Sequence, residues 1–259
     1  MKSYISPAKV NIFLKITGTR GVYHEILSRF MLVNNLSDTI TLKPKKEKSF
    51  VIDGDFTCKV EDNTIYKAYT HLSDFTKSSK LQNLMSEYKV DVKKNIPAFA
   101  GLGGGSSNAA TFLHMMNELA DLNLSNNILS DIGAKVGADV PFFIHSYSSA
   151  NVSGIGEIVE AFDEEPIELE IETPDIEIST PAVYQEYRKS FYNPIDTLTC
   201  KRLKATSSRD ILRDMTLKEA NDLFEPAVAL YHDLALHVRD DNFFSGSGSS
   251  FFRPKEGEL

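Results

Sequence analysis

The residue types best suited to chemistry lie in one glycine-rich run, Gly101–Gly105, followed at once by Ser106 and Ser107. Glycine has no Cβ, so this loop can take positive φ values, which we expect at Gly104, and can come close to a ligand. A helix with one apolar face follows, and either serine is expected to cap it. The residues of that face are Phe112, Leu113, Met116, Leu119 and Ala120. Free N–H groups and the helix dipole converge at such a start, which predicts a phosphate site, whereas a flexible linker would not lead into an amphipathic helix.

The loop fits neither of the two common phosphate-binding motifs. A Walker A loop needs a lysine that closes the glycine run, and none stands between Gly101 and Asn108. A Rossmann loop needs an acidic residue on a following strand, but Asp121 falls at the end of the same predicted helix. The charge of a nucleotide would therefore be met by backbone dipoles, Mg²⁺ and cations from elsewhere in the chain.

Asp139 and Lys9 are charged residues that stand alone in apolar stretches. A buried carboxylate stays ionised only with a partner, and Lys9 is a candidate partner. Such a pair beside a phosphate loop could accept the proton of an attacking hydroxyl and stabilise the transferred phosphoryl group. The alternative is that Asp139 caps a turn and Lys9 is a solvated charge, and the spacing does not decide between them.

The remaining chemical residues give weaker signals. Tyr23-His24 is more typical of loop packing than of a site, and Tyr184 is unremarkable by itself. The acidic run over residues 163–172 is expected to be a solvated edge. The six histidines have no HxxxH or HExxH spacing and the two cysteines no CxxC spacing, so no protein metal site is expected.

The composition indicates an ordinary globular protein that can bury a core. Of its 259 residues, 42% are hydrophobic and 25% are charged. The net charge of −8 disfavours a nucleic-acid partner. The chain has neither a signal peptide nor an apolar run of about 18 residues, which argues against a membrane protein and predicts a cytoplasmic one.

The elements that position these residues follow from hydrophobic periodicity. We expect Asn63 to cap a helix, and we expect Val140, which precedes proline, to be extended. Further helices are expected over residues 206–213 and 216–237, the latter interrupted at Pro226. The expected strands are residues 10–16, 39–42, 50–52, 88–93, 158–161, 167–172 and 176–179. Residues 245–250 form a second glycine–serine turn between aromatic strand residues.

Three segments in this order resemble the three motifs of the GHMP kinase superfamily. They are Pro-Ala-Lys-Val-Asn at residues 7–11, the stretch 97–110 with its glycine loop, and the turn 245–250. Three stretches together are most similar to the branch that acts on 4-diphosphocytidyl-2-C-methyl-D-erythritol: Pro-Ala-Lys-Val-Asn-Ile-Phe-Leu at 7–14, the glycine loop at 101–110 and Gly-Ala-Asp-Val-Pro-Phe-Phe at 137–143. Where that branch usually has Asp-Gly-Tyr-His, this chain has Gly-Val-Tyr-His at 21–24.

The resemblance implies an α+β fold of two domains and a kinase activity. Residues 1–150 would form a domain like the second domain of ribosomal protein S5, with the ATP phosphate loop. Residues 151–259 would form a ferredoxin-like domain that contributes to substrate binding. The implied reaction is phosphorylation by ATP, with Mg²⁺, of the substrate's 2-hydroxyl, in the non-mevalonate route to isoprenoid precursors. The implied partner is this small molecule, and the protein is expected to be a monomer or a weak homodimer.

The resemblance also assigns roles to residues of this chain. Lys9 and Asp139 would be the catalytic pair. The cytidine substrate would contact Asn11, Tyr23, His24, Thr180 and Tyr184, with the two tyrosines sandwiching the cytosine. ATP would contact Asn63, Lys94, Pro97, Gly101, Leu102, Gly103, Gly104, Gly105, Ser106 and Ser107.

Two alternatives from the same fold remain open. One is a related small-molecule kinase, such as a mevalonate or homoserine kinase, against which the 137–143 segment and the Tyr-His pair argue. The other is a non-catalytic nucleotide-binding protein, against which the presence of both Lys9 and Asp139 argues.

Overall fold

A computed structural model of the chain describes residues 2–259, which form two compact units built from interleaved stretches. The first unit takes residues 2–8, 34–96 and 103–146, and the second takes residues 9–33, 97–102 and 147–259. The expected boundary at residue 150 lies near the last change of unit along the chain, between Ser146 and Tyr147. Because the second unit also takes two earlier stretches, the division into 1–150 and 151–259 stays a prediction.

Two long paired strands, β1 (Ser3–Arg20) and β2 (Tyr23–Pro44), contribute residues to both units. They contain the strands expected over residues 10–16 and 39–42. The chain turns between them at Gly21, whose φ of 61° is a left-handed value that glycine adopts without strain. The two altered residues before Tyr23, Gly21 and Val22, therefore form a tight turn.

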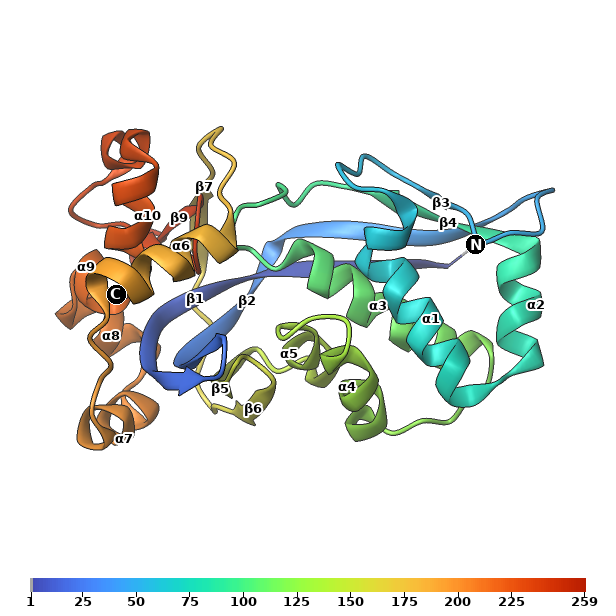
Figure 1. Cartoon of the computed structure of the whole chain (residues 1–259), viewed down its shortest axis with the longest axis horizontal. Helices are drawn as coiled ribbons and strands as arrows, with labels where there is room; N and C mark the ends of the chain where they lie inside the picture. The colour runs from blue at the N-terminus through green and yellow to red at the C-terminus, as the bar shows by residue number, and fades with distance from the viewer. Residues whose placement is uncertain (1) are drawn as a thin grey trace. The chain divides into compact units, whose positions relative to one another are not determined.

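The first unit contains several helices and the β3 (Ile52–Asp53), β4 (Tyr88–Lys93) and β2 end of a six-stranded sheet. Strand β2 pairs antiparallel with β4, from Thr39 opposite Lys93 to Pro44 opposite Tyr88, and β3 pairs parallel with β4. Helix α3 (Gly104–Leu119) contacts α1 (Thr64–Thr76) and α5 (Val140–His145), as Figure 1 shows. The other helices of this unit are η1 (Val60–Asp62), α2 (Ser79–Glu87) and α4 (Asn126–Ala134).

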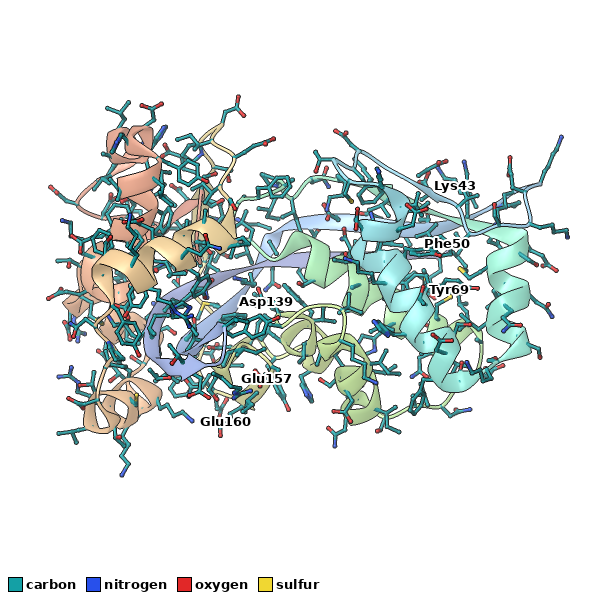
Figure 2. The ribbon with its side chains drawn as sticks, viewed as in Figure 1. Lys43, Phe50, Tyr69, Asp139, Glu157 and Glu160 are labelled. Carbon is teal, nitrogen blue, oxygen red and sulfur yellow. The ribbon has the colours of Figure 1, made fainter. Side chains whose placement is uncertain are left out.

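Local sequence signals account for several of these elements. The Asn63 side chain accepts a hydrogen bond from the backbone N–H of Ile65 at 2.9 Å, so it caps α1 as predicted. Phe112, Leu113 and Met116 of α3 are fully buried. Phe50 stacks on Tyr69 with 4.9 Å between ring centroids, and Figure 2 shows the two labelled side chains close together. No helix within residues 2–259 is both long and apolar enough to cross a bilayer.

The second unit contains the β2, β5 (Ser149–Gly154) and β6 (Ile158–Ala161) part of the six-stranded sheet and a separate three-stranded sheet. Strand β2 pairs with β5, which pairs with β6. The three-stranded sheet has the order β7 (Leu169–Glu172), β9 (Phe251–Pro254), β8 (Phe243–Phe244), so the turn over residues 245–250 joins β8 to β9 as predicted. The helices of the second unit are α6 (Thr180–Glu186), the π-helix η2 (Tyr187–Phe191), α7 (Thr197–Ala205), α8 (Ser208–Asp214), α9 (Leu217–Ala220), α10 (Phe224–Leu230) and η3 (His232–His237).

Three expectations about local structure are wrong. Val140 is the first residue of α5, because Pro141 stands in the first turn, where a missing N–H costs no helical hydrogen bond. The helix expected over residues 216–237 is three short helices, and Pro226 lies in the first turn of α10 instead of interrupting it. Residues 176–179 are not a strand, although Ile178 is buried.

Arg29, on β2, is a fully buried charge that the sequence argument did not single out. Its guanidinium lies 3.3 Å from the centre of the Phe162 ring and 3.4 Å from a Glu164 carboxylate oxygen. It also donates to the carbonyls of Lys204 and Thr206, which stand on either side of Ala205, the last residue of α7. Glu164 belongs to the acidic run that we expected to be solvated, but its side chain is only 10% exposed, pairs with Arg29 and accepts hydrogen bonds from Ser149 and Ser208.

Candidate active site

The glycine loop takes the backbone conformation that only glycine adopts easily. Gly101 and Gly103 have φ values of 73° and 70°. A Cβ at Gly101 would lie 2.1 Å from the carbonyl oxygen of Ser245, so no side chain fits there. Gly104 is the first residue of α3 and is helical, which makes the expectation of a left-handed Gly104 wrong.

The residue before α3 is Gly103, and no side chain caps the helix. The expected cap by Ser106 or Ser107 is therefore wrong, since both serines stand inside the first turn. The Ser107 hydroxyl is buried and accepts a hydrogen bond from Ser6 at 2.8 Å. Without a side-chain cap, the N–H groups of the first helical turn can bind an anion, together with the positive end of the helix dipole.

Lys9 lies beside Gly101 and Leu102, the part of the loop that belongs to the second unit. The lysine is 3% exposed, and its ammonium donates to Asn11 Oδ1 at 2.6 Å and to the Gly101 carbonyl at 3.0 Å. The ammonium also lies 4.5 Å from the centre of the Phe30 ring. The backbone N–H of Lys9 donates to the Leu102 carbonyl at 3.0 Å. The backbone of Gly101 and Leu102 and the lysine are thus fixed to each other, and Lys9 is not a solvated surface charge.

The glycine–serine turn after β8 completes the surroundings of Lys9. Ser245 Oγ donates to the Gly101 carbonyl at 3.0 Å and accepts from the backbone N–H of Asn11 at 3.4 Å. The Asn11 side-chain amide donates to Ser28 Oγ at 2.9 Å, which leaves its oxygen directed at Lys9. The first and third sequence motifs therefore meet at Gly101.

Asp139 is the residue before α5 in the first unit, and it has helical backbone angles. It does not cap the helix with its side chain, so the cap alternative is excluded for α5. The five residues after it, from Val140 to Ile144, are all buried, and Figure 2 shows the labelled Asp139. Since Lys9 belongs to the other unit, the pairing of Lys9 with Asp139 stays a prediction.

The two residues predicted near the adenine lie in the first unit. Asn63 is buried and engaged in capping α1. Lys94 follows β4 and pairs with the carboxylate of Asp38, a buried residue that the sequence argument missed. Pro97, which belongs to the second unit, is exposed, and Leu102 is buried. A nucleotide contact at each of these residues stays a prediction.

The predicted cytidine residues lie in the second unit with an aromatic contact among them. His24 is 7% exposed and stacks on Tyr184 with 5.2 Å between ring centroids, while Tyr187 meets it edge-on at 5.7 Å. Tyr23 is 61% exposed. Thr180 Oγ1 lies 2.6 Å from Ser247 Oγ of the glycine–serine turn. A cytosine sandwiched between Tyr23 and Tyr184 stays a prediction.

His24 carries an unusual unsatisfied atom. Its Nε2 is buried and has no hydrogen-bond partner within residues 2–259. Burial lowers the pKa of His24, and the nearby positive charge of Arg188 lowers it further, so the ring is neutral at pH 7. A neutral imidazole offers one donor and one acceptor, which suits a base edge. Within the same residues, no group of three or more His, Cys, Asp or Glu side chains could hold a metal ion.

Comparisons with known proteins agree with this geometry. Residues 63–147, which include the glycine loop and Asp139, match the GHMP kinases N terminal domain. Across 100% of this chain and 98% of the relative, the sequence is 58% identical to the 4-diphosphocytidyl-2-C-methyl-D-erythritol kinase of Sulfurimonas denitrificans. It is 42% identical to the enzyme of that name from Helicobacter acinonychis, over 95% and 94% of the two chains.

Solved structures show the same fold. A crystal structure of 4-(cytidine 5'-diphospho)-2C-methyl-D-erythritol kinase matches with a TM-score of 0.75 at 27% identity, covering 99% of this chain and 91% of that one. Mevalonate kinase of Methanococcus jannaschii matches with a TM-score of 0.60 over 98% and 90% of the chains, but at 13% identity this likeness concerns the fold alone.

The α+β fold, the glycine loop before α3 and the buried lysine beside it define a GHMP kinase. Within that superfamily, the chain belongs to the family of 4-diphosphocytidyl-2-C-methyl-D-erythritol kinases. Membership of a kinase family implies the use of ATP and a small-molecule acceptor.

Proposed function

We propose that this chain transfers the γ-phosphoryl group of ATP to the 2-hydroxyl of 4-diphosphocytidyl-2-C-methyl-D-erythritol, a step in the non-mevalonate route to isoprenoid precursors. The observation that carries the proposal is the buried Lys9 ammonium, bonded to the carbonyl of Gly101 in the phosphate loop. Family membership at 58% identity supports the choice of acceptor. The protein would act as a monomer or weak homodimer, without a nucleic-acid partner.

The residues around the glycine loop fit a triphosphate. Left-handed Gly101 and Gly103 leave the backbone bare, and the uncapped start of α3 offers N–H donors to phosphate oxygens. When bound, ATP supplies the phosphoryl group, and Mg²⁺ neutralises charge between its phosphates. Of the two loop serines, Ser107 would not reach the metal, because its hydroxyl is buried and accepts a hydrogen bond from Ser6.

The two proposed catalytic residues divide the work. Asp139 accepts the proton of the substrate 2-hydroxyl. At the same time the hydroxyl oxygen forms a bond to the γ-phosphorus, and the bond from that phosphorus to the β-phosphate oxygen breaks. Lys9 holds positive charge beside the loop, where charge develops on the transferred group. Asn11 and the Gly101 carbonyl fix the Lys9 ammonium, so little reorganisation is needed during the reaction.

The cytidine half of the acceptor would bind at the aromatic residues of the second unit. Tyr23 and Tyr184 would stack on the two faces of the cytosine, because a base offers a π surface on each side. The neutral His24 would read the polar edge, and this contact would satisfy its unpartnered Nε2. Thr180 would contact the same substrate from the start of α6.

The direct test is to incubate the protein with Mg-ATP and the cytidine diphosphate conjugate and to identify the product by phosphorus NMR. We expect a new phosphomonoester on the 2-oxygen and one ADP per product. Methylerythritol without cytidine, mevalonate and homoserine serve as control acceptors in parallel reactions. Transfer to a control acceptor with none to the conjugate would overturn the proposed acceptor. No ADP with any acceptor would favour a non-catalytic nucleotide-binding protein.

A further inference from the structure

Asp38, on β2 in the first unit, is a completely buried carboxylate with four donors around it. Oδ1 accepts from the backbone N–H groups of Asn95 at 2.7 Å and Ile96 at 2.9 Å. Oδ2 accepts from the side-chain amide of Asn108 at 2.9 Å and from the ammonium of Lys94. A buried carboxylate bonded at both oxygens is held in one position, and it fixes the groups that donate to it.

The second member of this cluster, Asn108 of α3, is fixed in one orientation. Its Oδ1 accepts from Lys94 Nζ at 2.9 Å, while its Nδ2 donates to Asp38 and to Ser6 Oγ. A flipped amide would set donor against donor at Lys94 and acceptor against acceptor at Asp38. The Lys94 ammonium is therefore held between two oxygens, which take two of its three hydrogens.

The cluster lies at the start of the phosphate-loop helix. A Cβ built on Gly104, the first residue of α3, would lie 3.6 Å from Lys94 Nζ. The ammonium thus stands next to the uncapped helix end that can bind an anion, and its third hydrogen makes no hydrogen bond within residues 2–259. The glycine loop contains no lysine, and Lys94 is a cation that reaches the loop from another part of the chain.

We propose that Asp38 is a positioning residue for the nucleotide site. By its bonds to Lys94 and Asn108, it holds the Lys94 ammonium and the first turns of α3 in the arrangement that binds ATP. The inference rests on the proposed function for its nucleotide. Asp38 would help ATP binding by positioning these groups and not by its charge, because its negative charge offsets the positive charge of Lys94. If its only effect were to neutralise Lys94, removing it would strengthen the attraction for phosphate.

The test compares D38N, K94M and the double variant of the full chain, with ATP affinity measured by calorimetry and KM measured for both substrates. In D38N, an amide NH₂ must face either the two backbone N–H groups or Lys94 and Asn108. We expect ATP binding to weaken by about ten- to a hundredfold, as losing a hydrogen bond to a charged group does. KM for the cytidine conjugate should not change.

Two comparisons separate positioning from a merely structural effect. In the K94M background, D38N should cause a smaller loss of ATP affinity than it causes alone, because Asp38 acts in part through Lys94. The matched control is D222N in the second unit. It also removes a carboxylate, one that accepts from the ammonium of Lys15 and from the strand N–H of Ile16. D222N should lower the unfolding temperature and leave ATP affinity unchanged.

Folded D38N with equal or tighter ATP binding would overturn the proposal, as would additive losses in the double variant. If D38N does not fold, N108A tests the same cluster: weaker ATP binding supports the proposal, and unchanged binding overturns it. Calorimetry needs no acceptor. A wild-type chain that binds ATP but phosphorylates no conjugate would therefore refute the proposed function while the variants still decide the role of Asp38.

Discussion

The surroundings of Lys9 and of His24, both in the second unit, differ in how completely their polar atoms are paired. Lys9 is tied to Asn11 and to Gly101, and Ser245 braces the same carbonyl. His24 is nearly as buried, yet its Nε2 has no hydrogen-bond partner within residues 2–259, and its neighbour Tyr23 is mostly exposed. The part proposed for phosphoryl transfer is therefore preorganised, whereas the part proposed for base recognition is completed by its ligand.

The largest effect should come from the base that works with the preorganised part. In Asp139→Asn, size and most hydrogen bonding are kept but the proton acceptor is lost, so kcat should fall by about 10²–10⁴-fold. Steady-state kinetics with the cytidine conjugate measure this, and Asp131→Asn on α4 is the matched control. Near-normal turnover of the Asp139 variant would remove this residue from the mechanism.

Lys9→Met tests the preorganised part directly. Methionine keeps the apolar stem and deletes the charge, and loss of one preorganised charge typically lowers kcat by about 10²–10³-fold. We expect this fall with a smaller change in KM for ATP. A variant in which only KM rises would make Lys9 a binding residue, and the contrast with His24 would then not be one between catalysis and recognition.

Gly101→Ala tests whether the loop geometry itself matters. The methyl group would meet the Ser245 carbonyl at 2.1 Å, so the loop must shift and ATP affinity should fall about tenfold or more. Gly257→Ala is the control, because Gly257 also has a positive φ but nothing lies within 4 Å of its added Cβ. Equal ATP affinity in folded Gly101→Ala would place the nucleotide elsewhere.

Tyr23→Ala and Tyr184→Ala sharpen the comparison at the recognition end. Each should cost about 1–3 kcal/mol of substrate binding, the usual range for stacking on a base. KM for the cytidine conjugate should rise while KM for ATP stays the same, and Tyr→Phe at either position should be mild. A shift confined to ATP would place these rings at the nucleotide instead.

The smallest effect concerns the pH dependence of stability at His24. Because the folded pKa of His24 lies below its unfolded value of about 6.5, the unfolded chain takes up a proton that the folded chain does not. The contribution of neutral His24 is complete above the unfolded pKa of about 6.5 and is lost as the pH falls below it, toward the lowered pKa of the folded state. The difference in free energy of unfolding between wild type and His24→Gln should therefore shrink below that pH in urea titrations. A difference that grows on acidification would contradict this assignment.

Local patterns in the sequence predict much of the fold and of the site. The glycine loop, the bounds of β4, the Asn63 cap and the turn after β8 all follow from residues close together in the chain. Asp38 and Arg29 are missed because their partners are remote: Asn108 is 70 residues from Asp38, and Asn151 is 122 from Arg29. An isolated charge in an apolar strand is the signal that marks Lys9, and it marks Arg29 as well.

The bond from Ser245 to the Gly101 carbonyl joins residues 144 positions apart, and that to the Asn11 N–H spans 234. During synthesis, the strand with Lys9 and the glycine loop leave the ribosome long before Ser245 does. The nascent chain can form the helices around α3 early, but the lysine's surroundings are completed only once nearly the whole polypeptide has been made. The part proposed for phosphoryl transfer would therefore be the last to mature, and a stalled or shortened chain would lack the bond from Ser245 to the Gly101 carbonyl.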